Sequence, residues 1–176
     1  TKKEFPSGIP EFGTDALRFT FASLATTGRD VRFDLKRIEG YRNFCNKLWN
    51  AARFIIMNTE GVKLLEKEPN PKNMSLADIW IQGKLHSLIK SIEKNITNYR
   101  IDLIANSLYD FVWHDYCNWY LELSKSILKD DDQSKLEQKQ ATQLNLLYTL
   151  DATLKCLHPI IPFITEELWQ TINTDP

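Results

Sequence analysis

The 176-residue sequence lacks any run of about 18 consecutive apolar residues, the length that a membrane-spanning helix requires. Its polar opening, TKKEFPSG, also lacks the apolar region of a secretory signal. Cysteine is scarce, because only three occur, far apart and without a C-x-x-C pair, which indicates reduced, buried thiols rather than a disulfide framework. These absences predict a cytoplasmic protein with no membrane contact.

Sequence motifs for nucleotide or metal chemistry are also missing. The chain contains no G-x-x-x-x-G-K-[ST], G-x-G-x-x-G or H-E-x-x-H pattern. His114 and Cys117 have the spacing of two zinc ligands on a helix, but no second pair completes a set of four. The segment KNMS at residues 72–75 is interpreted as a loop followed by a helix cap. We therefore expect no catalytic residue, no metal site and no cofactor in this chain.

The net charge of −1 is too small for a general attraction to nucleic acid, but the charges are unevenly placed. Residues 29–58 contain seven cations and three anions, whereas residues 61–176 contain 12 cations and 16 anions. This asymmetry predicts a local anionic partner near the front of the chain.

The helical period dominates the sequence, and no segment alternates convincingly at period two. Caps and breakers predict helices from about Asp15 to Gly28, from Asp34 to about Asn58, from Ser75 onward, over about 102–128, over about 134–157, and from Pro162 through Trp169. Thr14 is the expected N-cap of the first of these helices. Long helices joined by short loops predict an all-α fold, an antiparallel helical bundle. Residues 1–13, with two prolines and two glycines, are expected to be a linker, and residues 14–176 the bundle.

Apolar residues at helical spacing define the expected core. They are Ile81, Leu85, Leu88, Ile92 and Ile96 in the third helix, Leu108, Phe111, Val112, Tyr116, Trp119 and Leu123 in the fourth, and Leu147, Leu150, Leu154 and Leu157 in the fifth. The third helix is expected to begin with a capping box, in which Ser75 pairs with Asp78 three residues later.

The segment YRNFCNKLWNAARF, residues 41–54, separates two kinds of side chain on one helix. At about 100° per residue, one side collects Tyr41, Phe44, Cys45, Leu48, Ala52 and Ile55. The opposite side forms a ridge of Asn43, Lys47, Asn50 and Phe54, flanked by Asn46 and Arg53. Amides can bond base edges, cations can meet phosphates, and an aromatic ring can stack on an unpaired base. The ridge is therefore a candidate RNA-reading face, although an ordinary surface or a helix contact remains an alternative.

Four segments carry a resemblance to a known family. They are GTDALRF at residues 13–19, TTGRDVRFD at 26–34, GYRNFCNKLWNAARF at 40–54 and HPIIPFITEELW at 158–169. In this order they resemble the post-catalytic region of the valyl-tRNA synthetases, which belong to the class I aminoacyl-tRNA synthetases. Looser forms of the same motifs occur in the isoleucyl and leucyl enzymes.

The resemblance implies that residues 14–176 are an anticodon-binding domain of the class Ia type and that residues 1–13 lead from a catalytic domain absent here. The parent protein would be a valine-tRNA ligase that uses ATP and Mg²⁺ in that missing domain. The chain alone would have no enzymatic activity. Its partner would be a valine tRNA, and a monomer is the default expectation.

The resemblance also implies roles for individual residues. Asn46, Lys47, Asn50, Arg53 and Phe54 match the helix that meets the anticodon loop, which is the same ridge that periodicity indicates, with Arg32 and Lys36 on the approach. Phe54 would stack on a base, the amides would bond base edges, and the cations would meet phosphates. Valine anticodons share A and then C at their last two places, so those bases would be read.

Two alternatives stay open at this point. One is the same domain of another class I synthetase, isoleucyl or leucyl. The other is a helical module whose face from Asn43 to Phe54 docks a protein, and this module would bind with little dependence on salt, whereas RNA binding would depend on it steeply.

Overall fold

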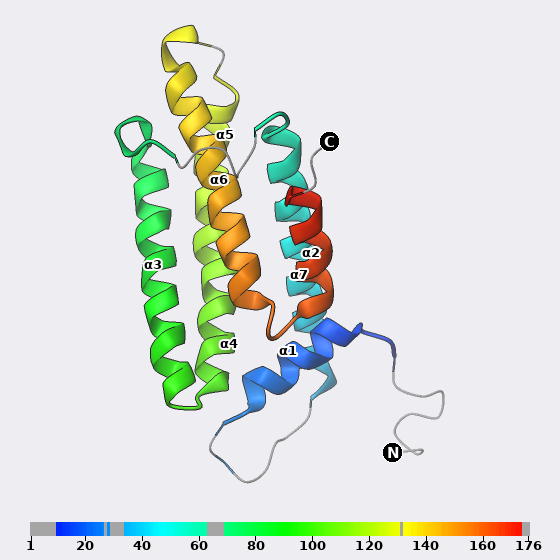
Figure 1. Ribbon diagram of the computed structural model, residues 1–176. Coiled ribbons are helices and arrows are strands. Elements are labelled where there is room, and N and C mark those ends of the chain that lie inside the picture. The colour runs from blue at the N-terminus through cyan, green and yellow to red at the C-terminus, as the bar shows by residue number, and fades with distance from the viewer. Residues whose placement is uncertain (1–9, 27, 29–33, 63–68, 131, 174–176) are drawn as a thin grey trace.

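The computed structural model describes residues 10–26, 28, 34–62, 69–130 and 132–173, and these residues form helices and loops with no strand. Figure 1 shows one bundle of long helices with a shorter helix, α1, across one end. The all-α prediction is confirmed. No helix of the described residues is both long and apolar enough to cross a membrane.

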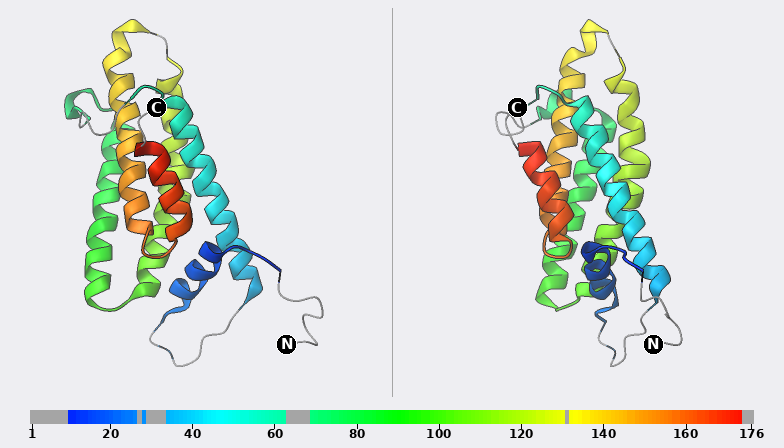
Figure 2. Two further views of the ribbon diagram at one scale, coloured as in Figure 1. Left: turned by 45° about the vertical axis from the view of Figure 1, so that its right-hand side comes forward. Right: turned by 90° about the vertical axis from the view of Figure 1, so that its right-hand side faces the viewer.

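The helices of the bundle alternate in direction along the chain, as Figures 1 and 2 show. The bounds are α1 Thr14–Leu24, α2 Leu35–Asn58, η1 Pro71–Asn73, α3 Leu76–Thr97, α4 Ile101–Asp110, η2 Phe111–Tyr120, α5 Leu121–Leu128, η3 Gln133–Lys135, α6 Leu136–Leu157 and α7 Pro162–Asn173. Helix α4, the π-helical segment η2 and α5 follow one another without a break. The expected antiparallel bundle is therefore confirmed.

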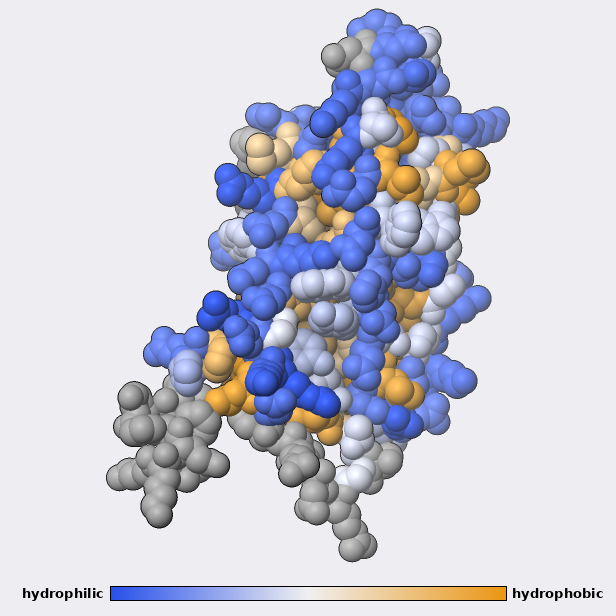
Figure 3. All heavy atoms as spheres, turned by 180° about the vertical axis from the view of Figure 1, so that it is seen from behind, coloured by the Kyte–Doolittle hydropathy of each residue, from blue (hydrophilic) through white to orange (hydrophobic). Residues whose placement is uncertain are grey.

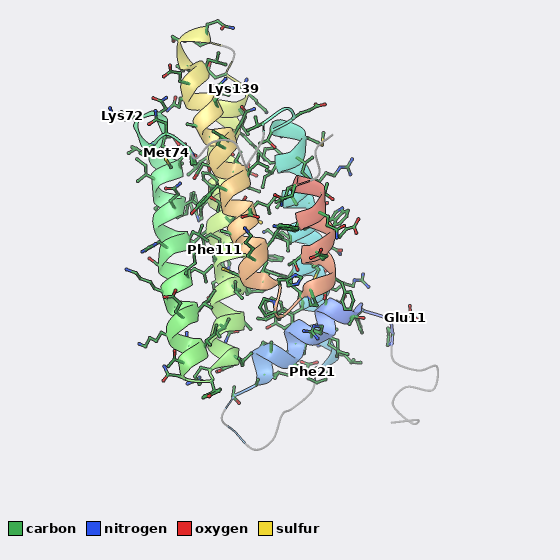
Figure 4. All side chains as sticks on the ribbon, viewed as in Figure 1. Glu11, Phe21, Lys72, Met74, Phe111 and Lys139 are labelled. Atoms are coloured by element: carbon green, nitrogen blue, oxygen red, sulfur yellow. The ribbon has the colours of Figure 1, made fainter. Side chains whose placement is uncertain are left out.

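Most of the expected helix caps are present. The Asp34 side chain accepts a hydrogen bond from the backbone N–H of Lys36, and Ser75 forms a capping box with Asp78. In KNMS, Ser75 is the expected cap, but Lys72 and Asn73 belong to the short 3-10 helix η1 rather than to an irregular loop. Figure 4 shows Lys72 and Met74 at the end of the bundle opposite Glu11 and Phe21.

Helix α1 differs from expectation at both ends. Gly13, with a positive φ of 90°, precedes it, whereas Thr14 is its first helical residue and does not cap it. The helix ends at Leu24, before the predicted stop at Gly28. Residues 1–9 of the expected linker lie outside the described residues, and residues 10–13 form no helix.

Helix α1 is fastened to the turn between α6 and α7. The Arg18 guanidinium donates from Nε to the Ile160 carbonyl at 2.8 Å and from Nη2 to the Pro159 carbonyl at 3.0 Å. The Asp15 carboxylate accepts from the backbone N–H of Ile164 at 2.7 Å, and so caps α7. Two residues of the DALR motif thus hold the HPIIPF motif, although the two segments are more than 140 residues apart in sequence.

The predicted core positions hold well in α3 and α6. Ile81, Leu85, Leu88, Leu147, Leu150, Leu154 and Leu157 are all buried. Ile92 is partly buried against this core, whereas Ile96, in the last turn of α3, is exposed.

Two predicted core residues, Trp119 and Leu123, are exposed, and Trp119 has 61% of its surface accessible. Residues Phe111–Tyr120 form a π-helix, in which each turn closes from residue i to i+5 rather than i+4. The wider turn advances the buried face, so that Tyr120 and Leu121 are buried instead. A regular helical period cannot show such a change of phase.

A buried carboxylate, Asp78, joins three helices. It has no exposed surface, and it accepts hydrogen bonds from the Ser75 hydroxyl of its own cap at 2.7 Å, from Tyr120 Oη at 2.6 Å and from Thr142 Oγ1 at 2.8 Å. The Asn145 amide donates to Tyr120 Oη at 2.8 Å. Because a buried charge is costly unless it is hydrogen-bonded, these donors fix α3, η2 and α6 relative to one another.

Truncation of buried leucines should lower the free energy of unfolding, whereas truncation of an exposed residue should not. Leu88→Ala and Leu154→Ala should each lower the free energy of unfolding by ~2 to 5 kcal/mol, because each leaves a cavity. Trp119→Ala, at a largely exposed position, should change it by less than about 0.5 kcal/mol. Urea titration measures all three, and losses below about 0.5 kcal/mol at both leucines would show that these buried faces are wrong.

Removal of one donor should test the buried carboxylate. Tyr120→Phe keeps the ring but leaves Asp78 without its shortest hydrogen bond, so the free energy of unfolding should fall by ~1.5 to 3 kcal/mol. Thermal and urea unfolding measure the loss. Tyr148→Phe, which alters a half-exposed tyrosine of α6, is the control, and equal stability of the two variants would contradict the structural role of Asp78.

Candidate nucleic-acid interface

Helix α2 has a buried side and an exposed side, as its sequence predicts. Its buried residues are Ile38, Phe44, Leu48, Ala51, Ala52 and Ile55. Aromatic packing anchors this side, because the Phe44 ring lies tilted against Phe19 of α1 and stacked on Tyr109 of α4, with ring centroids 5.0 and 5.2 Å apart. The outer side of α2 is thereby held in a fixed orientation.

The exposed side of α2 forms what we call the open face. It consists of Arg42, Asn43, Asn46, Trp49, Asn50, Arg53 and Met57, all exposed. The two arginines and three asparagines make no hydrogen bond or ion pair with any described residue. No acidic residue occurs from position 42 to position 57. The open face therefore offers amides, cations and one half-exposed indole to a partner.

Four residues of the predicted ridge and its flanks lie on the open face: Asn43, Asn46, Asn50 and Arg53. Sequence reasoning did not assign Arg42, Trp49 or Met57 to this side. The sequence could have placed Arg42 and Trp49 on this side. Both lie on the same helical row as Asn46 and Arg53, at spacings of three and four residues.

Lys47 does not stand free on the predicted ridge. Its ammonium donates to the Asn118 side-chain oxygen of η2 at 2.6 Å and lies 4.0 Å from the centroid of the Trp113 ring. Burial raises the pKa of the nearby Cys117 thiol to about 11, and the charge of Lys47 acts in the opposite direction. The Lys47 side chain is therefore packed between α2 and η2.

Phe54 is also packed rather than free. It is half-buried against the hydrophobic core, and the Lys125 ammonium of α5 lies 5.7 Å from its ring centroid. Lys47 and Phe54 thus line a seam between α2 and the η2–α5 segment. The helical pattern alone could not show that a neighbouring helix covers this edge of the ridge.

The two residues predicted on the approach have different outcomes. Lys36 lies exposed in the first turn of α2. Arg32 lies outside the described residues.

Figure 3 shows the bundle from the side opposite to Figure 1, and hydrophilic residues dominate that surface, with smaller apolar areas between them.

Truncations should distinguish the seam from the open face. Phe54→Ala should lower the free energy of unfolding by roughly 1 to 3 kcal/mol, less than the loss of a fully buried phenylalanine, because the ring is only half-buried. Arg53→Ala, one residue away on the open face, should change it by less than about 0.5 kcal/mol. Urea titration measures both. An unchanged free energy of unfolding for Phe54→Ala would contradict this packing and would agree with the sequence prediction that the ring is exposed.

Comparison with known proteins places the chain among relatives. A family model described as "Anticodon-binding domain of tRNA ligase" matches residues 78–176. The chain is 55% identical to the valine–tRNA ligase of Legionella pneumophila (strain Lens) over 170 residues, and 54% identical to that of Coxiella burnetii over 175 residues. These matches cover 97% and 98% of the chain, so they include α1 and α2, but the chain spans only 18% of each relative.

Solved structures share the fold at much lower identity. Methionyl-tRNA synthetase of Mycobacterium tuberculosis in its apo form superposes with a TM-score of 0.72 at 14% sequence identity, covering 92% of this chain and 33% of that one. The same enzyme bound by methionyl-adenylate gives a TM-score of 0.73 at 16% identity. At this level of identity the likeness concerns the fold alone.

Proposed function

The chain belongs to the family of anticodon-binding domains of tRNA ligases, and from this membership we propose that it binds the anticodon loop of valine tRNA as part of a valine–tRNA ligase. The open face of α2 is the observation that carries the proposal. Its amides and arginines are exposed and have no partner among the described residues, which is the chemistry that an RNA loop requires.

The proposed contacts divide by chemistry. Asn43, Asn46 and Asn50 each carry an amide that can donate and accept at a base edge. Arg53 neutralises a phosphate and sets the register of the loop. Arg42, at the other end of the open face, does the same.

The seam residues and the approach residues complete the proposed interface. Phe54 presents its exposed edge to a base, and Lys47 adds charge from a fixed position over Trp113. Lys36, in the first turn of α2, meets a phosphate, and Arg32, four residues earlier in the sequence, is proposed to do the same. The expected bases are the A and C that valine anticodons share at their last two places.

The remaining proposals concern the longer ligase. We propose that aminoacylation, with ATP and Mg²⁺, takes place in parts of the ligase outside this chain, because the sequence carries no phosphate-binding glycine motif. We propose no catalytic residue within the chain itself. A cytoplasmic location and a monomeric state, which the sequence suggested, also remain proposals.

Base reading and phosphate binding should give different signatures in RNA binding. Asn50→Ala should weaken binding of an RNA stem-loop with the valine anticodon by ~1 to 3 kcal/mol and have little effect once the A and C are replaced. Arg53→Ala should weaken binding of both RNAs similarly and reduce the slope of log affinity against log salt by about one. Fluorescence anisotropy over a range of salt concentrations measures both quantities.

Matched controls come from helices outside the proposed interface. Gln140→Ala removes an exposed amide from α6, and Lys94→Ala removes an exposed cation from α3. Neither should alter affinity or salt dependence. An Asn50→Ala chain that is indifferent to the anticodon, together with an Arg53→Ala chain of unchanged salt slope, would end the proposal that the open face binds RNA.

A further inference from the structure

A pocket of ≈ 310 Å³ lies where the beginning of α1, the first half of α2 and the beginning of α7 meet. Its lining includes Phe12, Asp15, Arg42, Cys45, Asn46 and Phe163. Arg42 and Asn46 also belong to the open face, so the pocket continues that face toward α1. Figure 4 shows the start of α1 beside the labelled Glu11, at the end of the bundle where α1 crosses.

The polar groups of the pocket include both donors and acceptors. Arg42 and Asn46 are exposed and make no hydrogen bond or ion pair with a described residue. Asp15 Oδ2 accepts from the Ile164 N–H at 2.7 Å, while Oδ1 has only a long contact of 3.4 Å to the Phe163 N–H. Asp15 therefore keeps accepting capacity on a carboxylate whose orientation is fixed.

The charge of Asp15 decides which kind of ligand the pocket suits. Burial, and to a smaller extent the charge of Asp15, raise the pKa of the neighbouring Cys45 thiol to about 12, so the thiol stays neutral. A carboxylate in the wall opposes a phosphate inside the pocket. It favours instead a group that donates hydrogen bonds.

Two phenylalanines supply the apolar part of the lining. Phe163 is the second residue of α7, 65% of its surface is exposed, and no ring among the described residues packs against it. Phe12 lies in the segment that leads into α1. Aromatic side chains beside free amide and carboxylate groups are the usual means by which proteins hold an unstacked base.

We propose that this pocket receives one unstacked nucleobase of the bound RNA, and that the base carries an exocyclic amino group. The base stacks on Phe163, its amino group donates to Asp15 Oδ1, and the Asn46 amide bonds another edge. Arg42, at the rim, meets the adjoining phosphate. The volume of the pocket lies at the lower end of small-molecule sites, about 300 to 1,000 Å³, and so suits one base rather than a stretch of chain.

The inference rests on the proposed function, because it requires that the open face binds RNA. Its test uses this chain, a stem-loop RNA with the valine anticodon, and a series of the same RNA with one abasic nucleotide at each loop position in turn. Phe163→Ala should weaken binding of the unmodified RNA by about 5- to 150-fold, the range for loss of one stacked base. Tyr148→Ala, which removes a half-exposed ring from α6, should have no effect.

The abasic series identifies the base. For one loop position, the wild-type chain should lose affinity for the abasic RNA, and Phe163→Ala should then cause no further loss. Phe12→Ala should likewise weaken binding of the unmodified RNA but cause no further loss with the RNA that is abasic at this position. At that position an analogue without the exocyclic amino group should bind the wild-type chain less tightly, and equal binding would overturn the amino-group assignment.

The outcomes separate this inference from the proposed function. A wild-type chain that does not bind the stem-loop overturns both. If the wild-type chain binds the stem-loop and Asn50→Ala weakens this binding, but Phe163→Ala leaves it unchanged, only the pocket proposal is overturned. A Phe163→Ala loss that is the same for every abasic RNA has the same consequence, because a contact with one base must vanish when that base is absent. Melting temperatures equal to that of the wild-type chain confirm that the variants are folded.

Discussion

The hydrogen bond between Tyr120 and the buried carboxylate of Asp78 is the constraint on which the interface depends. No ion pair joins Asp78 to a cation among the described residues, so its buried carboxylate depends on hydrogen-bond donors, chiefly Ser75, Tyr120 and Thr142. Tyr120 is the last residue of η2, and it therefore fixes the rotation of the π-helix. Sliding or rotating η2 would leave a buried charge short of a donor.

The fixed π-helix in turn fixes α2. From the other side of η2, Asn118 and Trp113 hold the Lys47 ammonium, and Phe44 of α2 stacks on Tyr109 just before η2 begins. These contacts of Lys47 and Phe44 fix the rotation of α2 about its axis, and so they fix the direction in which the open face points. Rigid support of this kind would lower the entropy lost on the proposed RNA binding, because the donors and acceptors are ordered beforehand.

Much of the fold could be predicted from the sequence, because helix caps and core stripes are local patterns. Asp34, the Ser75–Asp78 box and the leucines of α6 lie where periodicity put them. The prediction that Trp119 is buried was wrong, because the π-helix shifts which residues face the core. The residue types alone do not reveal such a shift. The seam around Phe54 and the pocket beside Asp15 were also beyond reach, because each is built from helices that are distant in sequence.

The segments that carry the family resemblance also acquire a physical meaning. DALR and HPIIPF are joined by the hydrogen bonds of Asp15 and Arg18, and the same Asp15 lines the pocket beside the open face. One carboxylate thus caps α7 and presents an acceptor to the pocket. The net charge of −1 gives a further reason for such local contacts, because the chain cannot attract RNA by its overall charge. The proposed binding would then depend on a few cations, amides and rings held in place. The bundle keeps the amides and arginines of α2 exposed by burying the opposite side of that helix.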